Sequence, residues 1–219
     1  MKKHVILQLV TVIALSALVS CGDLFNTNVI VGEGEVIAET RIFSGFSKIK
    51  SEIGADINII ESDESKIVIT IQENLLAYLS TKVSSGVLTI TFDGNNVSTK
   101  EGIVIDIYTS TVEKFTLTGA GDVDSELPIG NILLTGAGNI KCKGSLTNFE
   151  ASITGAGNFN FYEMPVQNAT IRISGTGDVK VQVSNSLNVT ISGVGNVYYK
   201  GYPQVSTTIS GIGNVVNSN

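Results

Sequence analysis

The chain has 219 residues, of which 42% are apolar, and its 20 acidic and 14 basic side chains give a net charge of −6. This composition fits a folded core and argues against intrinsic disorder, and 23 glycines against three prolines favour β structure. The negative charge also argues against nucleic acid as a partner, because nucleic-acid-binding proteins present basic patches.

Residues 1–20 are predicted to be a bacterial lipoprotein signal peptide and not part of the fold. Residues 1–4 form a short basic start, and the apolar run 5–19 follows. That run is short for a transmembrane helix, which needs about 20 apolar residues. It ends in Leu-Val-Ser-Cys-Gly at 18–22, which resembles a lipobox, so we predict Cys21 to be the lipidated first residue of the mature protein. An ordinary cleaved signal with a chance cysteine is the alternative.

Loss of this signal changes the chemistry available to the chain. It removes the only histidine, His4, and two lysines, which leaves 12 basic against 20 acidic residues, a net charge of −8. Cys21 and Cys142 are then the only cysteines. If Cys21 carries the lipid that anchors the protein to the bilayer, Cys142 has no intrachain partner and no disulfide framework is expected.

Residues 21–31 are polar and mixed, which is typical of a tether between lipid and fold. Residues 32–116 predict an irregular N-terminal β region. Its strands are expected where runs rich in β-branched residues lie between polar turns, at 57–60, 67–71, 87–92 and 103–108. The one helix candidate is 73–79. We expect this region to be continuous with the segment that follows, with a separate small β domain as the alternative.

Residues 117–219 repeat one motif six times: Ser or Thr, then Gly-x-Gly, then Asn or Asp and an apolar residue. The first glycines are separated by 17, 19, 20, 18 and 18 residues, and they are Gly119, Gly136, Gly155, Gly175, Gly193 and Gly211. A nearly constant short period predicts a solenoid, in which each repeat packs against its neighbours. We therefore expect an all-β, parallel β-helix-like solenoid with repeats of about 18 residues.

Alternation within each repeat predicts which side chains face the core. In the fourth repeat, Ile171 and Ile173 share their parity with Gly175, Gly177 and Val179, while polar residues fall opposite. Both glycines of a motif are therefore expected at a bend where backbones approach closely.

The prolines give a second estimate of the register. Pro128, Pro165 and Pro203 follow the second glycine of their repeats by seven, eight and eight residues. Because proline cannot donate to a sheet ladder, this phase predicts a corner of the coil.

These repeats, together with the lead-in segments 32–36, 39–41, 44–49 and 73–76, resemble the GIN domain family, described as an auto-transporter adhesin head in lipoproteins of Gram-negative bacteria. The resemblance covers residues 32 to 215. It implies a β-solenoid in the cell envelope and brings no catalytic residues with it.

Two kinds of ligand site are disfavoured for the repeats. Phosphate-binding Gly-x-Gly loops open helices, whereas these continue into strands. A calcium roll needs several carboxylates, but the position after the second glycine is Asn in four of six copies, and only Asp122 and Asp178 are charged there. Asparagines that stabilise the turn or stack in a ladder are the preferred interpretation.

An enzyme is disfavoured. The acidic segment 61–65 is typical of a solvated turn, and the mature chain has no histidine to shuttle protons. Cys142 shares its parity with Ile140, which predicts a buried structural thiol. Tyr162, Tyr198 and Lys200 have outward parity and are interpreted as ordinary surface, with stacking of the aromatic rings on sugars as the alternative. We therefore assign no catalytic, cofactor-binding or metal-ligating residue, and Cys21 as the lipidation site.

The sequence thus predicts a lipid-anchored, non-enzymatic β-solenoid of the cell envelope, an outer-membrane lipoprotein on the periplasmic or the outer side. Its expected function is adhesion or ligand binding, with a glycan or a protein as partner. The alternatives are an assembly module that self-associates through its open end, with a homo-oligomer as the product, and a polysaccharide-active β-helix enzyme.

Overall fold

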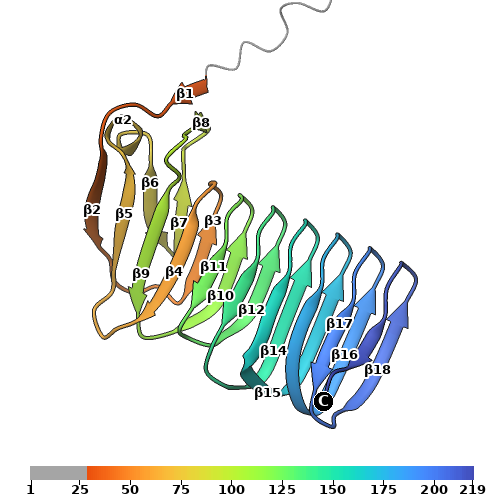
Figure 1. Cartoon of the computed structure of the whole chain (residues 1–219). Coiled ribbons are helices and arrows are strands. Elements are labelled where there is room, and N and C mark those ends of the chain that lie inside the picture. The colour runs from red at the N-terminus through yellow and green to blue at the C-terminus, as the bar shows by residue number, and fades with distance from the viewer. Residues whose placement is uncertain (1–28) are drawn as a thin grey trace, which may run out of the picture.

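The computed structural model describes residues 29–219 (Figure 1). The predicted signal peptide 1–20, the lipidation site Cys21 and most of the tether lie outside the described residues. Between residues 29 and 219, no helix has the length and apolarity to span a bilayer.

The described chain is all-β apart from one short helix, as the sequence predicts. Its N-terminal elements are β1 (Val29–Val31), β2 (Val36–Ile42), β3 (Lys48–Ser51), β4 (Asp56–Glu61), β5 (Lys66–Gln72), α2 (Glu73–Leu76), β6 (Ser80–Ser84), β7 (Val87–Thr91), β8 (Asn96–Ser98) and β9 (Val104–Thr109). The repeats hold β10 (Val112–Leu117), β11 (Val123–Ser125), β12 (Ile129–Leu134), β13 (Ile140–Cys142), β14 (Leu146–Ile153), β15 (Phe159–Ile173), β16 (Val179–Ile191), β17 (Val197–Lys200), β18 (Gln204–Ile209) and β19 (Val215–Asn217).

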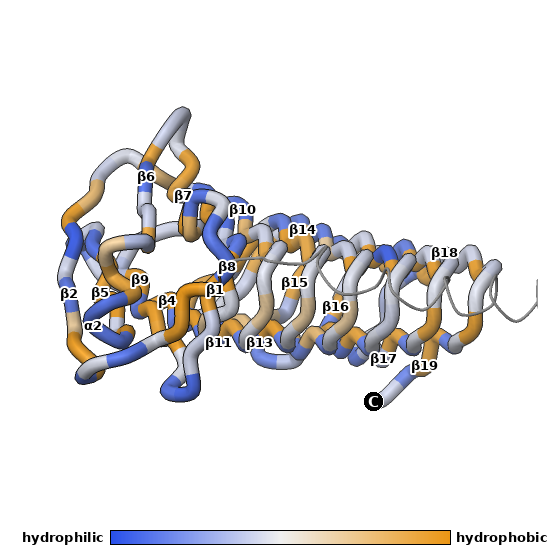
Figure 2. Tube along the Cα trace, turned by 90° about the horizontal axis from the view of Figure 1, so that it is seen from above, coloured by the Kyte–Doolittle hydropathy of each residue, from blue (hydrophilic) through white to orange (hydrophobic). Residues whose placement is uncertain are grey.

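Two parallel ladders run through the repeats. The first joins β10, β12, β14, the C-terminal parts of β15 and β16, and β18. The second joins β11, β13, the N-terminal parts of β15 and β16, β17 and β19. Seen from above, the two ladders form two layers that face each other along the length of the repeats (Figure 2). Each repeat therefore contributes one strand to each layer.

The Gly-x-Gly segments are the bends that lead from the first ladder to the second. The backbones there lie so close that a Cβ added to Gly136 would stand 1.7 Å from the carbonyl oxygen of Gly119. Gly121 has a φ of +122°, which favours glycine. The predicted close approach of backbones at these bends is confirmed, since glycine is required on steric grounds.

The prolines mark the opposite crossing, from the second ladder back to the first. Pro128 and Pro203 lie in the short connections before β12 and β18, which confirms the predicted corner at these two positions. Pro165 lies inside β15, but at a place where the register of that strand shifts. The chain therefore crosses there without leaving the strand.

The N-terminal region extends both ladders. β3 pairs in parallel with β10 and β7, and β4 pairs in parallel with β11 and β9. Beyond them the pairing becomes antiparallel, between β6 and β7, β5 and β9, and β2 and β5. The predicted strands of this region are confirmed, and the helix is shorter than expected. The division at residues 116 and 117 stays a prediction.

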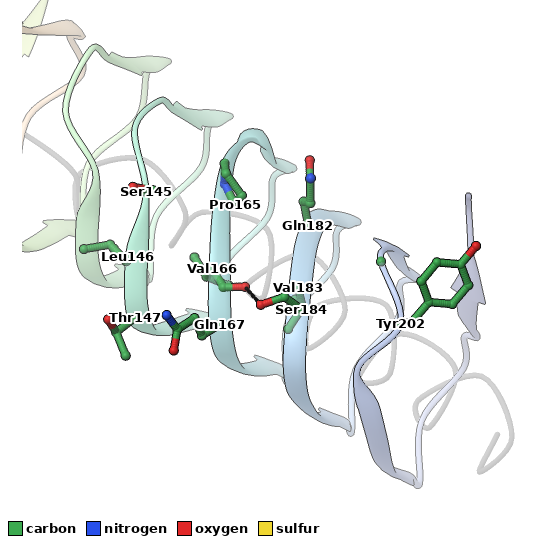
Figure 3. Close-up of a pocket in the computed structure, with 11 residues that line it drawn as sticks. Ser145, Leu146, Thr147, Pro165, Val166, Gln167, Gln182, Val183, Ser184 and Tyr202 are labelled. Carbon is green, nitrogen blue, oxygen red and sulfur yellow. Dashed lines mark hydrogen bonds between the residues drawn. The ribbon is translucent and has the colours of Figure 1, made fainter.

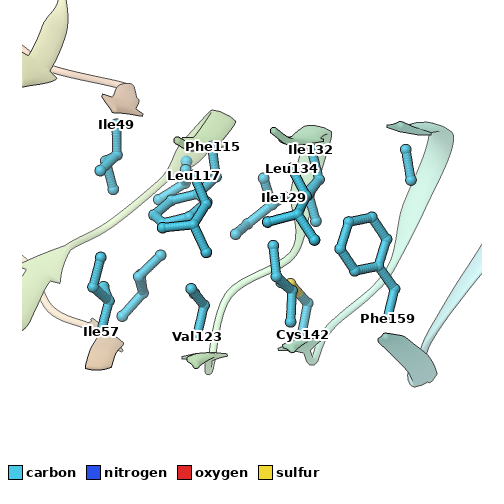
Figure 4. Packing of buried hydrophobic residues seen from close by; sticks show 14 of the residues in the cluster. Ile49, Ile57, Phe115, Leu117, Val123, Ile129, Ile132, Leu134, Cys142 and Phe159 are labelled. Carbon is cyan, nitrogen blue, oxygen red and sulfur yellow. The ribbon is translucent and has the colours of Figure 1, made fainter. Parts of the chain in front are cut away.

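The core lies between the two layers. In Figure 4, Phe115, Leu117 and Leu134 of the first ladder point toward Val123 and Cys142 of the second. These side chains are at most 2% exposed. Burial of an apolar side chain of this size stabilises a fold by about 1.5–3 kcal/mol. The alternation of the sequence therefore identified the core face of the repeats correctly.

Candidate functional site

The position after each second glycine forms a row of hydrogen bonds along the molecule. Asp122 Oδ1 accepts from the backbone amide of Asn139 (2.9 Å) and from its Nδ2 (3.0 Å). Asn139 Oδ1 in turn accepts from Asn158, and Asn158 Oδ1 accepts from the amide of Asp178. The same pattern continues through Asn196 to the last repeat. The asparagine ladder predicted from the sequence is confirmed.

The Asn and Asp side chains of this ladder hydrogen-bond to the neighbouring repeats. From Asp122 to Asn196, the Oδ1 atom of each of these side chains accepts a bond from the next repeat, so the ladder is a structural device that ties one bend to the next. Among residues 29–219, no three His, Cys, Asp or Glu side chains gather so that they could hold a metal ion.

The ladder starts in the N-terminal region. Asp56 Oδ1 accepts from the amide of Asp122 at 2.9 Å. Gly54, in the segment that echoes the repeat motif, pairs with Ala120. Residues 53–57 carry the repeat motif with one glycine missing, and this echo is the sequence signal for the expectation that the N-terminal region is continuous with the repeats.

The thiol of Cys142 is fully buried, as predicted. Burial raises its pKa far above the ordinary value for a thiol, and the negative charge of Asp124 adds to that shift. The thiol therefore stays neutral and is no nucleophile.

The outward aromatic residues differ in their surroundings. Lys200 Nζ lies 4.5 Å from the centre of the Tyr162 ring, a cation–π contact between β17 and β15 that reaches across the intervening strand β16. Tyr198 is half-buried on β17. These residues are part of the surface, and the structure does not bring the three of them into one pocket.

The acidic turn 61–65 is a solvated surface. Glu64 Oε2 lies 2.9 Å from Lys66 Nζ, and this hydrogen bond lowers the pKa of the Glu64 carboxyl below its ordinary value. A carboxyl that is held ionised by a lysine is unsuited to act as a general acid.

A groove lies at the corner opposite the glycine bends. This groove has a volume of about 550 Å³ (Figure 3). It is lined by side chains from four successive repeats: Ser145, Leu146, Thr147, Pro165, Val166, Gln167, Gln182, Val183, Ser184, Gly201 and Tyr202. We call it the corner groove.

The corner groove exists because successive corners have different lengths. Phe161 pairs with Val181, and the next pair is Val166 with Val183. Four residues of β15 therefore stand beside the single residue Gln182 of β16. The longer corner protrudes and the shorter one leaves a hollow next to it, as β-bulges commonly do beside binding sites.

The lining of the corner groove is uncharged and mixed. The amides of Gln167 and Gln182 are exposed, and the Tyr202 side chain is 88% exposed at one end. The Ser184 hydroxyl donates to the Val166 carbonyl at 3.4 Å. Amides and hydroxyls beside an exposed aromatic ring can hydrogen-bond a neutral polar ligand and stack on its apolar face.

Sequence reasoning did not find this groove. The outward residues Tyr162, Tyr198 and Lys200, which it interpreted as ordinary surface, do not line the groove. The available signal was the uneven spacing of the motifs, because the longest interval, 20 residues, separates Gly155 from Gly175 and contains the protruding corner.

A family model described as "Putative auto-transporter adhesin, head GIN domain" matches residues 45–134 and 131–203 of the chain. The chain belongs to the GIN domain family. This confirms the resemblance that the repeats and the lead-in segments indicate. No curated protein matches this GIN domain.

Solved structures resemble this GIN domain in fold. One is a "putative adhesin" from Bacteroides fragilis, with 20% identity, a TM-score of 0.63, and coverage of 86% of this chain and 100% of that one. A "putative adhesin" from Parabacteroides merdae gives 20% identity, a TM-score of 0.55, and coverage of 87% and 99%. A "putative lipid binding protein" from Parabacteroides distasonis gives 20%, 0.51, and 87% and 100%. At these identities the likeness concerns the fold.

Proposed function

We propose that this GIN domain is a non-catalytic adhesin of the cell envelope that binds a neutral glycan in the corner groove. The observation that carries the proposal is the uncharged lining, in which the Gln167 and Gln182 amides and the exposed ring of Tyr202 line the same groove. Sugars present many hydroxyls and an apolar ring face, which these groups match. Membership in a family of adhesin heads supports the same function.

We also propose that the fold is a β-solenoid, which supplies a rigid frame for the groove. The two parallel ladders support it, since each repeat pairs only with the repeats before and after it. A rigid frame reduces the entropy lost on binding.

We also propose where the protein is located in the cell. The adhesin family supports a protein of the cell envelope. The basic start, the apolar run and the lipobox-like segment that ends at Cys21 support an outer-membrane lipoprotein. Replacement of Cys21 by serine is expected to move the protein from the membrane fraction to the soluble fraction.

We propose that the protein is not a catalyst because the side chains that could act as acid or nucleophile are paired or buried. Glu64 forms an ion pair with Lys66, and Cys142 is buried in the core. The corner groove contains no carboxylate, whereas glycoside hydrolysis normally uses two.

The test is a glycan-array screen with the soluble form that starts at Gly22, followed by calorimetry on the best ligand. Tyr202→Ala is expected to weaken binding at least about tenfold, which corresponds to about 1.4 kcal/mol. Tyr198→Ala is the matched control, because this tyrosine lies on β17 in the second ladder, outside the groove. It is expected to bind as the parent form does.

Two results would contradict the proposal. One is equal loss of glycan binding in Tyr198→Ala and Tyr202→Ala with both proteins folded. The other is binding to neutral lipid vesicles that Tyr202→Ala abolishes, with no glycan bound by any form. The second result would assign the groove to lipid.

A further inference from the structure

The last repeat leaves one end of the core uncovered by any described residue. All six residues of β18 are exposed, with Val205 at 40% and Ile209 at 43%. In the bend after it, Ile212 is 73% exposed. The other end differs, since Ile67 and Ile69 of β5 are fully buried and β5 pairs antiparallel with both β2 and β9.

The backbone of β18 also presents a free edge. Ser210 donates its amide to the Ile191 carbonyl of β16 at 2.9 Å. In a parallel ladder, alternate residues direct both backbone groups to the same neighbour. The amides and carbonyls of Val205, Thr207 and Ile209 therefore point away from β16, and no described strand pairs with that side of β18. Such an edge is a template for another strand.

This edge lacks the usual protection against pairing. Natural edge strands carry charges, prolines or bulges that prevent association. Residues 201–219 contain no Asp, Glu, Lys or Arg, and Pro203 lies before β18. The outer strand at the opposite end, β2, carries Glu39 and Arg41, which form an ion pair at 2.6 Å. The two ends of the molecule are therefore not equivalent.

We propose that β18 pairs antiparallel with β18 of a second copy, about a two-fold axis at Thr207. In that register Val205 lies opposite Ile209 of the partner subunit, and Thr207 lies opposite its own copy. The backbone groups that point away from β16 become the hydrogen-bonding groups of the new pair. This inference goes beyond the proposed glycan binding and does not depend on it.

The strand that pairs with this edge comes from a second copy of the chain, because β18 is complementary to its own copy. An uncharged strand brings no like charges together when it meets its own copy. Val205, Thr207 and Ile209 stand in register with the core residues Leu187, Val189 and Ile191. Pairing therefore places Val205 beside Ile209 of the partner subunit on the core face and joins two open cores into one. A two-fold interface of this kind closes, so the product is a dimer and not a fibre.

The first test is light scattering on the soluble form that starts at Gly22. We expect twice the mass of one chain at high concentration, with dissociation on dilution. Thr207→Lys places two ammonium groups opposite each other at the axis and is expected to give a monomer. Thr208→Lys is the matched control, because it adds the same charge to the outward face, in register with the exposed Thr190. It is expected to remain a dimer, and circular dichroism checks that both variants are folded.

The second test fixes the register. Hydrogen-bonded antiparallel partners have Cα atoms about 5.5 Å apart, which lies within the range that a disulfide spans. In the form that starts at Gly22, Thr207→Cys is expected to give a disulfide-linked dimer on mild oxidation. Thr208→Cys is expected to stay unlinked. The buried Cys142 does not interfere.

Three results would overturn the inference. The first is a monomer at every concentration for the form that starts at Gly22. The second is a dimer that Thr207→Lys leaves intact and in which Thr207→Cys does not cross-link. The third is a monomer that becomes a dimer only when residues 22–28 are removed, because that would show the chain's own N-terminal segment to be the occupant of the edge.

Discussion

Asn139 receives two hydrogen bonds from Asn158 on one side-chain oxygen, from the backbone amide at 3.2 Å and from Nδ2 at 3.1 Å. Asn139→Ala removes this acceptor and leaves a backbone amide unsatisfied at a bend. We expect a loss of about 1–2 kcal/mol in the free energy of unfolding, measured by denaturant titration. Asn188→Ala is the control, because no described residue hydrogen-bonds to that exposed side chain. An equal loss in both variants would contradict a structural role for the ladder.

The glycine bends permit a sharper test of stacking. Gly136→Ala would place a methyl group 1.7 Å from the Gly119 carbonyl oxygen, so the two repeats must separate. We expect a loss of at least about 4 kcal/mol or failure to fold, seen as a lowered melting temperature or as insoluble protein. Gly54→Ala is the matched control, since a Cβ there meets nothing within 4 Å. Its melting temperature is expected to stay within a few degrees of the parent value. A stable Gly136→Ala protein would show that the repeats stack less closely.

Two buried serines are expected to respond in opposite directions. The Ser51 hydroxyl is buried, and no described residue hydrogen-bonds to it. Ser125 Oγ, by contrast, donates to the Leu127 carbonyl at 2.8 Å and accepts from its amide. Ser51→Ala should leave stability unchanged or raise it by up to about 1 kcal/mol, whereas Ser125→Ala should lower it by about 1–2 kcal/mol. Matched losses in denaturant titrations would contradict this account.

Cys142 should be inert in the native protein. Burial raises the pKa of its thiol, so no thiolate is available at neutral pH. In the form that starts at Gly22, a thiol reagent is expected to label nothing until denaturant unfolds the chain, after which one thiol per chain reacts. Labelling that is fast in the native state would mean that the second ladder opens locally near β13.

Acid is expected to remove a small stabilising contribution of the Glu163–Lys141 pair. The hydrogen bond from Lys141, with Nζ 2.8 Å from the Glu163 carboxylate, lowers the pKa of that carboxyl below its ordinary value of 4.5. A lowered carboxyl pKa contributes stability above the unfolded pKa, and this contribution is lost as the pH falls. Glu163→Gln should therefore be less stable than the parent protein at pH 7 and about equal to it at pH 3.

The control for this pH dependence is Glu113→Gln, because no described lysine or arginine forms an ion pair with Glu113. Its stability difference from the parent protein should not change between the two pH values. Parallel pH dependence of the Glu163 and Glu113 variants would assign the effect to overall charge.

The sequence predicted the repeats well because one physical constraint recurs in each of them. Ile171 and Ile173 must face the core, and the glycines must admit a neighbouring backbone, so parity and motif spacing suffice to place them. Local patterns of this kind can be recognised in a single sequence.

The corner groove and the antiparallel pairing in the N-terminal region could not be predicted from such patterns. Ile67, Ile69 and Ile71 recur at every second position whether the neighbouring strand is parallel or antiparallel, so the pattern does not distinguish the two. Gln182 and Tyr202 line one groove only because the corner between Phe161 and Val166 is longer than its neighbour. That difference is a relation between two repeats and is not visible within one.

The ladder that joins the bends has a consequence for the order of folding. Its first bond, between Asp56 and Asp122, joins residues 66 positions apart, while each later bond spans only 17 to 20 positions. Closing the longer loop costs more chain entropy than any later step. We expect the first step to limit the folding rate and the later repeats to add in sequence from the N-terminal side, each on a template already formed. A chain that emerges from a translocation pore N-terminus first would meet these steps in the same order.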